Sequence, residues 1–245
     1  MSTRFSVLGT SLLVSIVLAG CSHLPGKPGP GPEVPRPDSV LNPVVLFNQN
    51  CQGCHGADGK DGPAMMLSNP VYLALVDDEI LRSVVSKGRP GTAMAAFAQK
   101  EGGMLTDEQV NAIIRGVRER WSKPNALGGD TAPPYASKSA GDPAHGQAVY
   151  ATFCAACHGA DGRGGPKAGS IVDHAYLSLI TDQGLRTIVI TGRPDFNAPD
   201  WRNNVAGHPM SEQEITDVVA WLASQRPNRA VGVAANPSSA TGGAQ

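Results

Sequence analysis

The sequence of 245 residues has few aromatic residues, no excess of charge of either sign and few cysteines. Phe, Trp and Tyr make up 5% of the chain against 29 Gly and 20 Pro, so we expect extensive loops around thin apolar cores. The formal net charge of −1 argues against a nucleic-acid-binding protein, which would carry a basic patch or stripe. All five cysteines belong to short motifs, which leaves none for a structural disulfide.

Four of the cysteines lie in two copies of the pattern Cys-x-x-Cys-His, namely Cys51 to His55 and Cys154 to His158. In this pattern the two thiols add to the two vinyl groups of one haem, and the imidazole that follows can ligate the iron. A redox dithiol also reads Cys-x-x-Cys, and two such pairs could hold one zinc ion. Neither alternative needs a His directly after each second Cys. We therefore predict two covalently bound haem c groups, attached at Cys51, Cys54, Cys154 and Cys157, with His55 and His158 beside the irons.

The N-terminus predicts export and attachment to a membrane. Residues 1–20 contain Arg4 and then a mostly apolar run from Phe5 to Leu18, which is short for a membrane span. The run ends in Leu-Ala-Gly-Cys, which resembles the bacterial lipoprotein processing site and implies cleavage before Cys21 and acylation of that residue. Several acyl chains hold a protein firmly at a bilayer. A single transmembrane anchor is the alternative.

The rest of the chain divides into two repeated units and three connecting or terminal segments. Residues 21–43 form a Pro/Gly-rich tether, residues 44–123 the first unit, 124–144 a linker, 145–227 the second unit and 228–245 a disordered tail. In the first unit we expect helices over 44–50, 77–86 and 106–121, the last opened by a capping box of Thr106 and Gln109. The second unit should end in a helix that runs to about residue 224.

The two units share more than the haem motif. Cys-x-x-Cys-His-Gly-Ala-Asp-Gly recurs in both, as do Tyr-Leu-x-Leu at residues 72–75 and 176–179 and Gly-Arg-Pro at residues 88–90 and 192–194. Each unit resembles a class I c-type cytochrome domain. The resemblance covers nearly all of residues 44–227 and implies an all-α protein with two tandem class I cytochrome c domains joined by a Pro/Gly-rich linker.

The resemblance also implies further roles. A Pro carbonyl should accept a hydrogen bond from each ligand His, for which Pro63 and Pro166 are the candidates. Arg89 and Arg193 are candidates to pair with haem propionates, because a guanidinium fork suits a carboxylate. A Met after Gly-Arg-Pro should be the sixth ligand of the first haem, which points to Met94, with Met104 as its rival.

The second unit departs from this pattern. Ala198 stands where the first unit has Met94, and alanine cannot ligate iron. Met210 and His208 are the nearby donors, with Met210 aligned to Leu105 and placed directly before a helix. An iron open to small ligands is the third possibility. His145 and His174 could also approach this iron. We rank Met210 first and leave the other possibilities open.

The contact between the first and last helices should also differ between the units. In the family a small residue on the first helix packs against an aromatic residue on the last, and the second unit has Gly146 and Trp221. The first unit has Pro43 and Gly116 in the aligned places. We therefore expect its helix contact to be built differently and its fold to be looser.

These features predict a dihaem electron carrier on the periplasmic side of a bacterial membrane, held by a lipid anchor. It should pass single electrons between redox protein partners, with an oxidase or dehydrogenase complex as a candidate partner, and it should bind no nucleic acid. No catalytic residues are required, because the redox chemistry is that of the haem. The alternative is a dihaem peroxidase-like enzyme with an open second iron.

Overall fold

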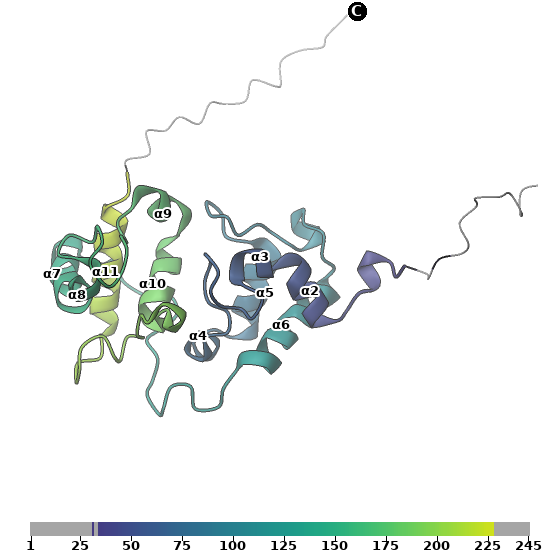
Figure 1. Cartoon of the computed structure of the whole chain (residues 1–245), viewed down its shortest axis with the longest axis horizontal. Coiled ribbons are helices and arrows are strands. Elements are labelled where there is room, and N and C mark those ends of the chain that lie inside the picture. The colour runs from purple at the N-terminus through teal and green to yellow at the C-terminus, as the bar shows by residue number, and fades with distance from the viewer. Residues whose placement is uncertain (1–30, 32–33, 228–245) are drawn as a thin grey trace, which may run out of the picture. The chain divides into compact units, whose positions relative to one another are not determined.

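The computed structural model describes residue 31 and residues 34–227 (Figure 1). The predicted signal over 1–20, the lipid attachment site Cys21, most of the tether and the tail lie outside the described residues. The chain divides after Ser39; the part before it contributes the 3-10 helix η1 (Pro37–Ser39), and both haem motifs lie in the part after it. Secondary structure in the described part is helical apart from three isolated bridges, so the prediction of an all-α fold is confirmed.

The helices of the first half follow the predicted order. They are α2 (Pro43–Asn50), α3 (Gln52–His55), α4 (Pro70–Leu75), α5 (Asp78–Lys87) and α6 (Asp107–Trp121), with a 3-10 turn η2 (Gln99–Glu101). Asp77 caps α5 by accepting from the N–H of Ile80. Thr106 and Gln109 form the predicted capping box of α6. The α3 turn presents the first Cys-x-x-Cys-His directly after α2.

The second half repeats this order. Its helices are α7 (Pro143–Phe153), α8 (Ala155–His158), α9 (His174–Leu179), α10 (Asp182–Thr191) and α11 (Glu212–Ser224), with a 3-10 turn η3 (Pro194–Phe196). Each helix has its counterpart in the first half, and α8 carries the second haem motif. Ser211 and Glu214 form a second capping box, at the start of α11.

The first and last helices of the second half, α7 and α11, lie side by side (Figure 1). Gly146 makes this possible, because a Cβ there would lie 2.0 Å from the Asp217 carbonyl oxygen and 2.9 Å from Trp221 Cβ. The predicted packing of Gly146 on Trp221 is therefore present. Tyr150 adds a ring contact to Trp221, with the centroids 4.3 Å apart.

In the first half the same contact is built with the partners exchanged, as expected from Pro43 and Gly116. The small residue is now on the last helix, and a Cβ on Gly116 would lie 2.4 Å from Pro43 Cβ. The aromatic partner comes from farther along α6, where Trp121 meets Phe47 edge-to-face at 5.2 Å. Whether this arrangement is looser stays a prediction.

The helix α4 is shared between the two hydrophobic cores. Tyr72 and Leu73 pack in the core of the first half, whereas Val71 belongs to the core of the second half. Figure 1 shows α4 beside α10, with which it is in contact. The two halves therefore meet through a helix whose opposite faces are buried in different cores.

The linker 124–144 runs along the second half and is held by arginines. Arg202 donates to the Leu127 carbonyl at 2.6 Å and forms an ion pair with Asp130 at 3.4 Å. The buried Arg186 donates twice to the Pro134 carbonyl, at 2.9 and 3.1 Å. These bonds fix the linker in place, although its Pro- and Gly-rich composition alone suggests a loose connection.

Candidate haem sites

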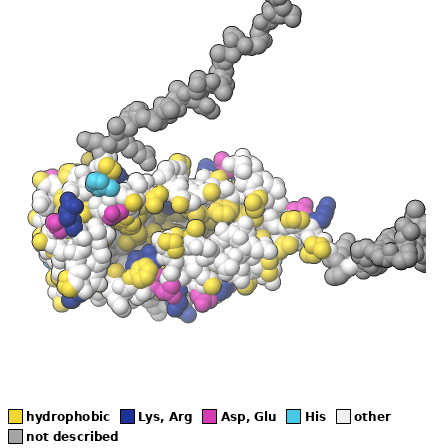
Figure 2. Space-filling view, turned by 45° about the horizontal axis from the view of Figure 1, so that its top comes forward, with side chains coloured by type: hydrophobic (Ala, Val, Ile, Leu, Met, Phe, Trp, Pro, Cys, Tyr) yellow, Lys and Arg dark blue, Asp and Glu magenta, His cyan; other side chains and the backbone are white. Residues whose placement is uncertain are grey.

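Both haem motifs open onto one cavity of about 1470 Å³. This exceeds the ~300–1000 Å³ of a typical site for one small molecule, as expected for a cavity that serves two large groups. Its lining is largely apolar, and Figure 2 shows hydrophobic side chains along a hollow on one face of the molecule. The lining includes all the predicted attachment and axial residues except the two rival donors, Met104 and His208: Cys51, Cys54, His55, Met94, Cys154, Cys157, His158 and Met210.

Each motif His is oriented by a backbone carbonyl. His55 Nδ1 lies 2.7 Å from the Met65 carbonyl oxygen, and His158 Nδ1 lies 2.7 Å from that of Gly169. Because a carbonyl only accepts, each Nδ1 carries the proton and each Nε2 keeps a free lone pair, the state needed to ligate iron. Burial, opposed by the Met65 carbonyl and aided by Arg193, lowers the pKa of His55, which keeps its imidazole neutral.

These bonds correct the prediction that Pro63 and Pro166 supply the carbonyls. Both prolines are exposed, and the acceptors lie two and three residues farther on, at Met65 and Gly169. The reason is a tight turn at Gly62, where a Cβ would lie 2.3 Å from the Cys54 carbonyl oxygen. The Ala64 N–H then bonds the same carbonyl, and the chain passes beneath the imidazole only after it. Sequence gives no signal for this, because any residue can offer a carbonyl.

Cys51 and Cys154, the first cysteines of the two motifs, have the opposite properties from the reactive thiol of a redox dithiol. Burial, with a smaller effect of Cys54, raises the pKa of the Cys51 thiol to about 11. Burial, with a smaller effect of Cys157, raises the pKa of Cys154 to about 12. Reactive Cys-x-x-Cys pairs instead have one thiol with a lowered pKa. The environment of these thiols therefore favours attachment of an apolar group over dithiol exchange.

In the first half, Met94 lines the cavity and Met104 does not. Met104 is 73% exposed, at a turn before α6. The Met94 loop is fixed at its base, because the Arg89 N–H donates to the Met94 carbonyl at 2.8 Å and Thr92 Oγ1 to the Arg89 carbonyl at 2.8 Å. The structure thus brings Met94 alone of the two to the haem cavity.

Hydrogen bonds in the second half show that Ala198 takes the place of Met94. The Arg193 N–H donates to the Ala198 carbonyl at 2.9 Å, as Arg89 does to Met94. Met210 is 3% exposed and lines the cavity. Its N–H bonds the Trp201 carbonyl, just as the Leu105 N–H bonds that of Phe97, so Met210 occupies the place of Leu105. A thioether therefore enters the second site from a different point of the loop.

His208, the rival donor, does not line this cavity. Its Nε2 forms an ion pair with Glu214 at 3.3 Å, and its half-exposed ring packs edge-on against Phe153. The Asn204 side chain, by contrast, reaches Met210 Sδ at 4.0 Å and lines the cavity. The structure thus brings Met210, not His208, to the second haem cavity.

The repeated arginines both line the cavity and are both engaged by protein partners. Arg89 donates to the Tyr135 hydroxyl of the linker. Arg193 forms an ion pair with Asp195 at 2.8 Å and also donates to the Gly62 carbonyl at 3.1 Å. Their predicted pairing with propionates stays a prediction. Neither Tyr135 nor Asp195 stood out in the sequence, because nothing in a linker or a loop marks a residue as the partner of a distant arginine.

Comparison with known proteins agrees with this arrangement. Residues 143–226 match the family described as cytochrome c, and residues 39–115 match the family described as cytochrome c oxidase, cbb3-type, subunit III. A curated relative, the cbb3-type cytochrome c oxidase subunit CcoP of Azospirillum sp. (strain B510), is 34% identical over 134 residues. The match covers 50% of this chain and 40% of the relative, so the chain spans less than half of that protein's length.

This chain is also similar to a chain in the solved structure of the Kuenenia stuttgartiensis reducing HAO-like protein complex. The match covers 80% of this chain and 100% of the other chain, with 18% sequence identity and a TM-score of 0.43. Each of the two family matches covers one of the two helical halves, and each contains one Cys-x-x-Cys-His motif. With two covalently bound haem c groups, the chain is a dihaem c-type cytochrome of two tandem cytochrome c domains.

Proposed function

We propose that the protein is an electron carrier in which each half holds one haem c between the motif His and a Met thioether. The observation that carries this proposal is the arrangement repeated in both halves: a His whose Nδ1 is held by a carbonyl, and a Met lining the same apolar cavity. The bound haem supplies the one-electron chemistry. The cysteine side chains attach it, backbone carbonyls orient its ligand histidines, and apolar side chains shield it from water.

Met94 and Met210 define what each site does. A thioether ligand favours reduced iron and raises the potential. A protein ligand on both sides of an iron also leaves no position for a substrate, which suits a carrier. The two thioethers come from different points of their loops. Met94 aligns with Ala198 of the second half, whereas Met210 aligns with Leu105 of the first half. The two haems should therefore differ in potential, as needed for directional transfer.

The experiment that tests this function is an optical redox titration of the full chain. We expect two reversible one-electron steps per chain, at two distinct potentials, without loss of haem over repeated cycles. A chain with one haem, or haems that do not return to the oxidised form, would refute the proposal.

A membrane oxidase of the cbb3 type is the partner we propose. Support comes from the family matched by the first half and from the name of the curated relative. The test is to mix the reduced protein with a purified oxidase of this type and record reoxidation of its haems in air. Reoxidation no faster than without the oxidase would exclude this partner.

We also propose that the protein is tethered on the periplasmic side of the membrane through Cys21. The Leu-Ala-Gly-Cys sequence supports this, as does the Pro/Gly-rich segment that follows. No helix in the described part of the chain, residues 31 and 34–227, is long and apolar enough to cross a bilayer. The substitution Cys21→Ser should move the exported protein from the membrane fraction to the soluble one; continued membrane association would contradict the lipid tether.

A peroxide-reducing enzyme is the second candidate, favoured by one observation. Ala198 occupies the structural position of Met94 and offers no ligand. In that function the second haem would be the reaction site and the first its electron source. Hydrogen peroxide added to the reduced chain should then oxidise the haems within seconds, whereas a carrier with two closed irons should react far more slowly.

A further inference from the structure

We propose that the contact between the two halves is a specific interface, here called the dock, that holds the two haems at one fixed separation. Asn69 at the start of α4 and the Arg193–Asp195 pair after α10 are its positioning residues. The proposal rests on the electron-carrier function, because a fixed separation sets how fast one haem passes an electron to the other. Its first test measures the distance between the two irons, not activity.

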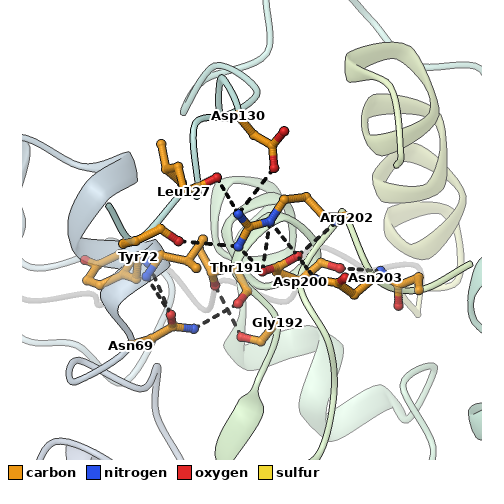
Figure 3. A network of polar contacts seen from close by, with 12 residues as sticks. Asn69, Tyr72, Leu127, Asp130, Thr191, Gly192, Asp200, Arg202 and Asn203 are labelled. Atoms are coloured by element: carbon orange, nitrogen blue, oxygen red, sulfur yellow. Dashed lines mark hydrogen bonds and ion pairs between the residues drawn. The ribbon is translucent and has the colours of Figure 1, made fainter. Parts of the chain in front are cut away.

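Asn69 connects the halves through a buried side chain that is 1% exposed. Its Oδ1 caps α4 by accepting from the Val71 N–H at 2.9 Å, and its Nδ2 donates to the Thr191 carbonyl at the end of α10, also at 2.9 Å. Figure 3 shows this bridge, with Thr191 and Gly192 on one side and Tyr72 on the other. The oxygen of the Asn69 amide thus caps α4, and its N–H group alone links the two halves.

The second contact lies beside the loop that follows the first haem motif. The side chain of Asp195 is fully buried and binds Arg193 through both oxygens, at 2.8 and 3.0 Å. The same carboxylate accepts from the Asp61 N–H at 3.2 Å, and Arg193 donates to the Gly62 carbonyl at 3.1 Å. The pair therefore presents an acceptor and a donor to two successive residues of the first half. Such a pairing fixes orientation as well as distance.

Comparison of the repeats shows that Asn69 and Asp195 stand only where the halves meet, whereas Arg193 has a counterpart in Arg89. The place of Asn69 is taken in the second half by the exposed Asp173, which caps α9 but has no amide to donate. The place of Asp195 is taken in the first half by Gly91. The place of Leu75, which packs against the second core, is taken by Leu179, which is 59% exposed.

The substitution Asn69→Asp separates the dock from the helix cap. Asp keeps the capping oxygen and is as good an N-cap as Asn. It removes the donor to the Thr191 carbonyl and leaves that buried carbonyl unpaired. We expect the ratio of docked to undocked molecules to fall about 10- to 100-fold. Asn42→Asp is the control for the cap alone, since the exposed Asn42 caps α2 in the same way, by accepting from the N–H groups of Val44 and Val45.

The measurement is pulsed electron paramagnetic resonance on the fully oxidised full chain, which gives the distribution of distances between the two irons. We expect one narrow distribution for the natural protein and for the control Asn42→Asp, and a broad one for Asn69→Asp. Asp195→Asn, which weakens the second contact, should broaden it as well. A broad distribution in the natural protein, or a narrow one in both junction variants, would overturn the proposal.

A second readout separates this proposal from the proposed function. The redox titration of Asn69→Asp should still show two reversible steps, because Asn69 does not line the haem cavity, while interhaem electron exchange after photoreduction slows at least several-fold. Unchanged exchange with a broadened distance distribution would show that the dock does not serve transfer. Haems that fail to cycle in the natural protein would instead refute the carrier function itself.

Discussion

The substitution Gly146→Ala tests directly how closely α7 and α11 pack against each other. The new Cβ would lie 2.0 Å from the Asp217 carbonyl oxygen, whereas real Cβ contacts stay at 3.0 Å or more. The α7 and α11 helices would therefore have to separate by about 1 Å, the difference between these two distances. A gap of that size forfeits a quarter to a half of the dispersion energy of the facing atoms, and overpacking of this kind costs about 3 kcal/mol.

The assay is equilibrium unfolding of the oxidised full chain in urea, followed by tryptophan fluorescence. Trp221 faces the altered contact, and its emission contributes to the signal together with that of Trp121 and Trp201. Gly53→Ala is the matched control: a Cβ there meets nothing within 4 Å, and the second repeat has Ala156 in the same place. We expect the control to stay within ~0.5 kcal/mol of the natural protein. An unfolding free energy of Gly146→Ala equal to that of the control would refute the described packing.

Three further predictions follow from the sites and the linker. Met94→Ala should make the reduced first haem bind carbon monoxide, seen as a shifted Soret band, while Met104→Ala binds none; equal behaviour of the two would refute Met94 as ligand. Burial raises the pKa of Asp217, but bonds from the Asp142 N–H, His145 and Gln213 outweigh it and bring the pKa below its ordinary 3.8. The resulting stability is complete above that value and is lost as the pH falls from it through the lower pKa of Asp217 in the folded protein, so Asp217→Asn should flatten the decline of unfolding free energy below about pH 4; a decline as steep as in the natural protein would contradict this. Arg202→Gln should raise the rate of limited proteolysis near Leu127 about tenfold, because that carbonyl loses its donor; an unchanged rate would show that the linker is held elsewhere.

Much of the fold could be predicted because the local signals agree with one another. The capping box at Thr106 and Gln109, the apolar spacing along α5 and the repeated haem motif each predicted an element that the structure contains. The pairing of Gly146 with Trp221 was also predictable, because the family resemblance aligned both residues. These features depend on residues close in sequence or on positions repeated between the halves.

The parts that sequence missed depend on contacts between distant segments. The carbonyls of Met65 and Gly169 act through the backbone, so their residue types carry no information about the role. The partners of Arg89 and Arg193, Tyr135 and Asp195, were hidden for another reason. A guanidinium pairs with whichever acceptor the fold brings near, and that depends on how the two halves meet.

The most direct test of the central claim is carbon monoxide binding by the dithionite-reduced full chain. If Met94 and Met210 close both irons, the chain should bind no carbon monoxide at concentrations that saturate a five-coordinate haem. Tight binding of one carbon monoxide per natural chain, together with binding of two per chain by Met94→Ala, would show that the second iron is open. That result would contradict the carrier with two closed haems and favour the peroxide-reducing enzyme.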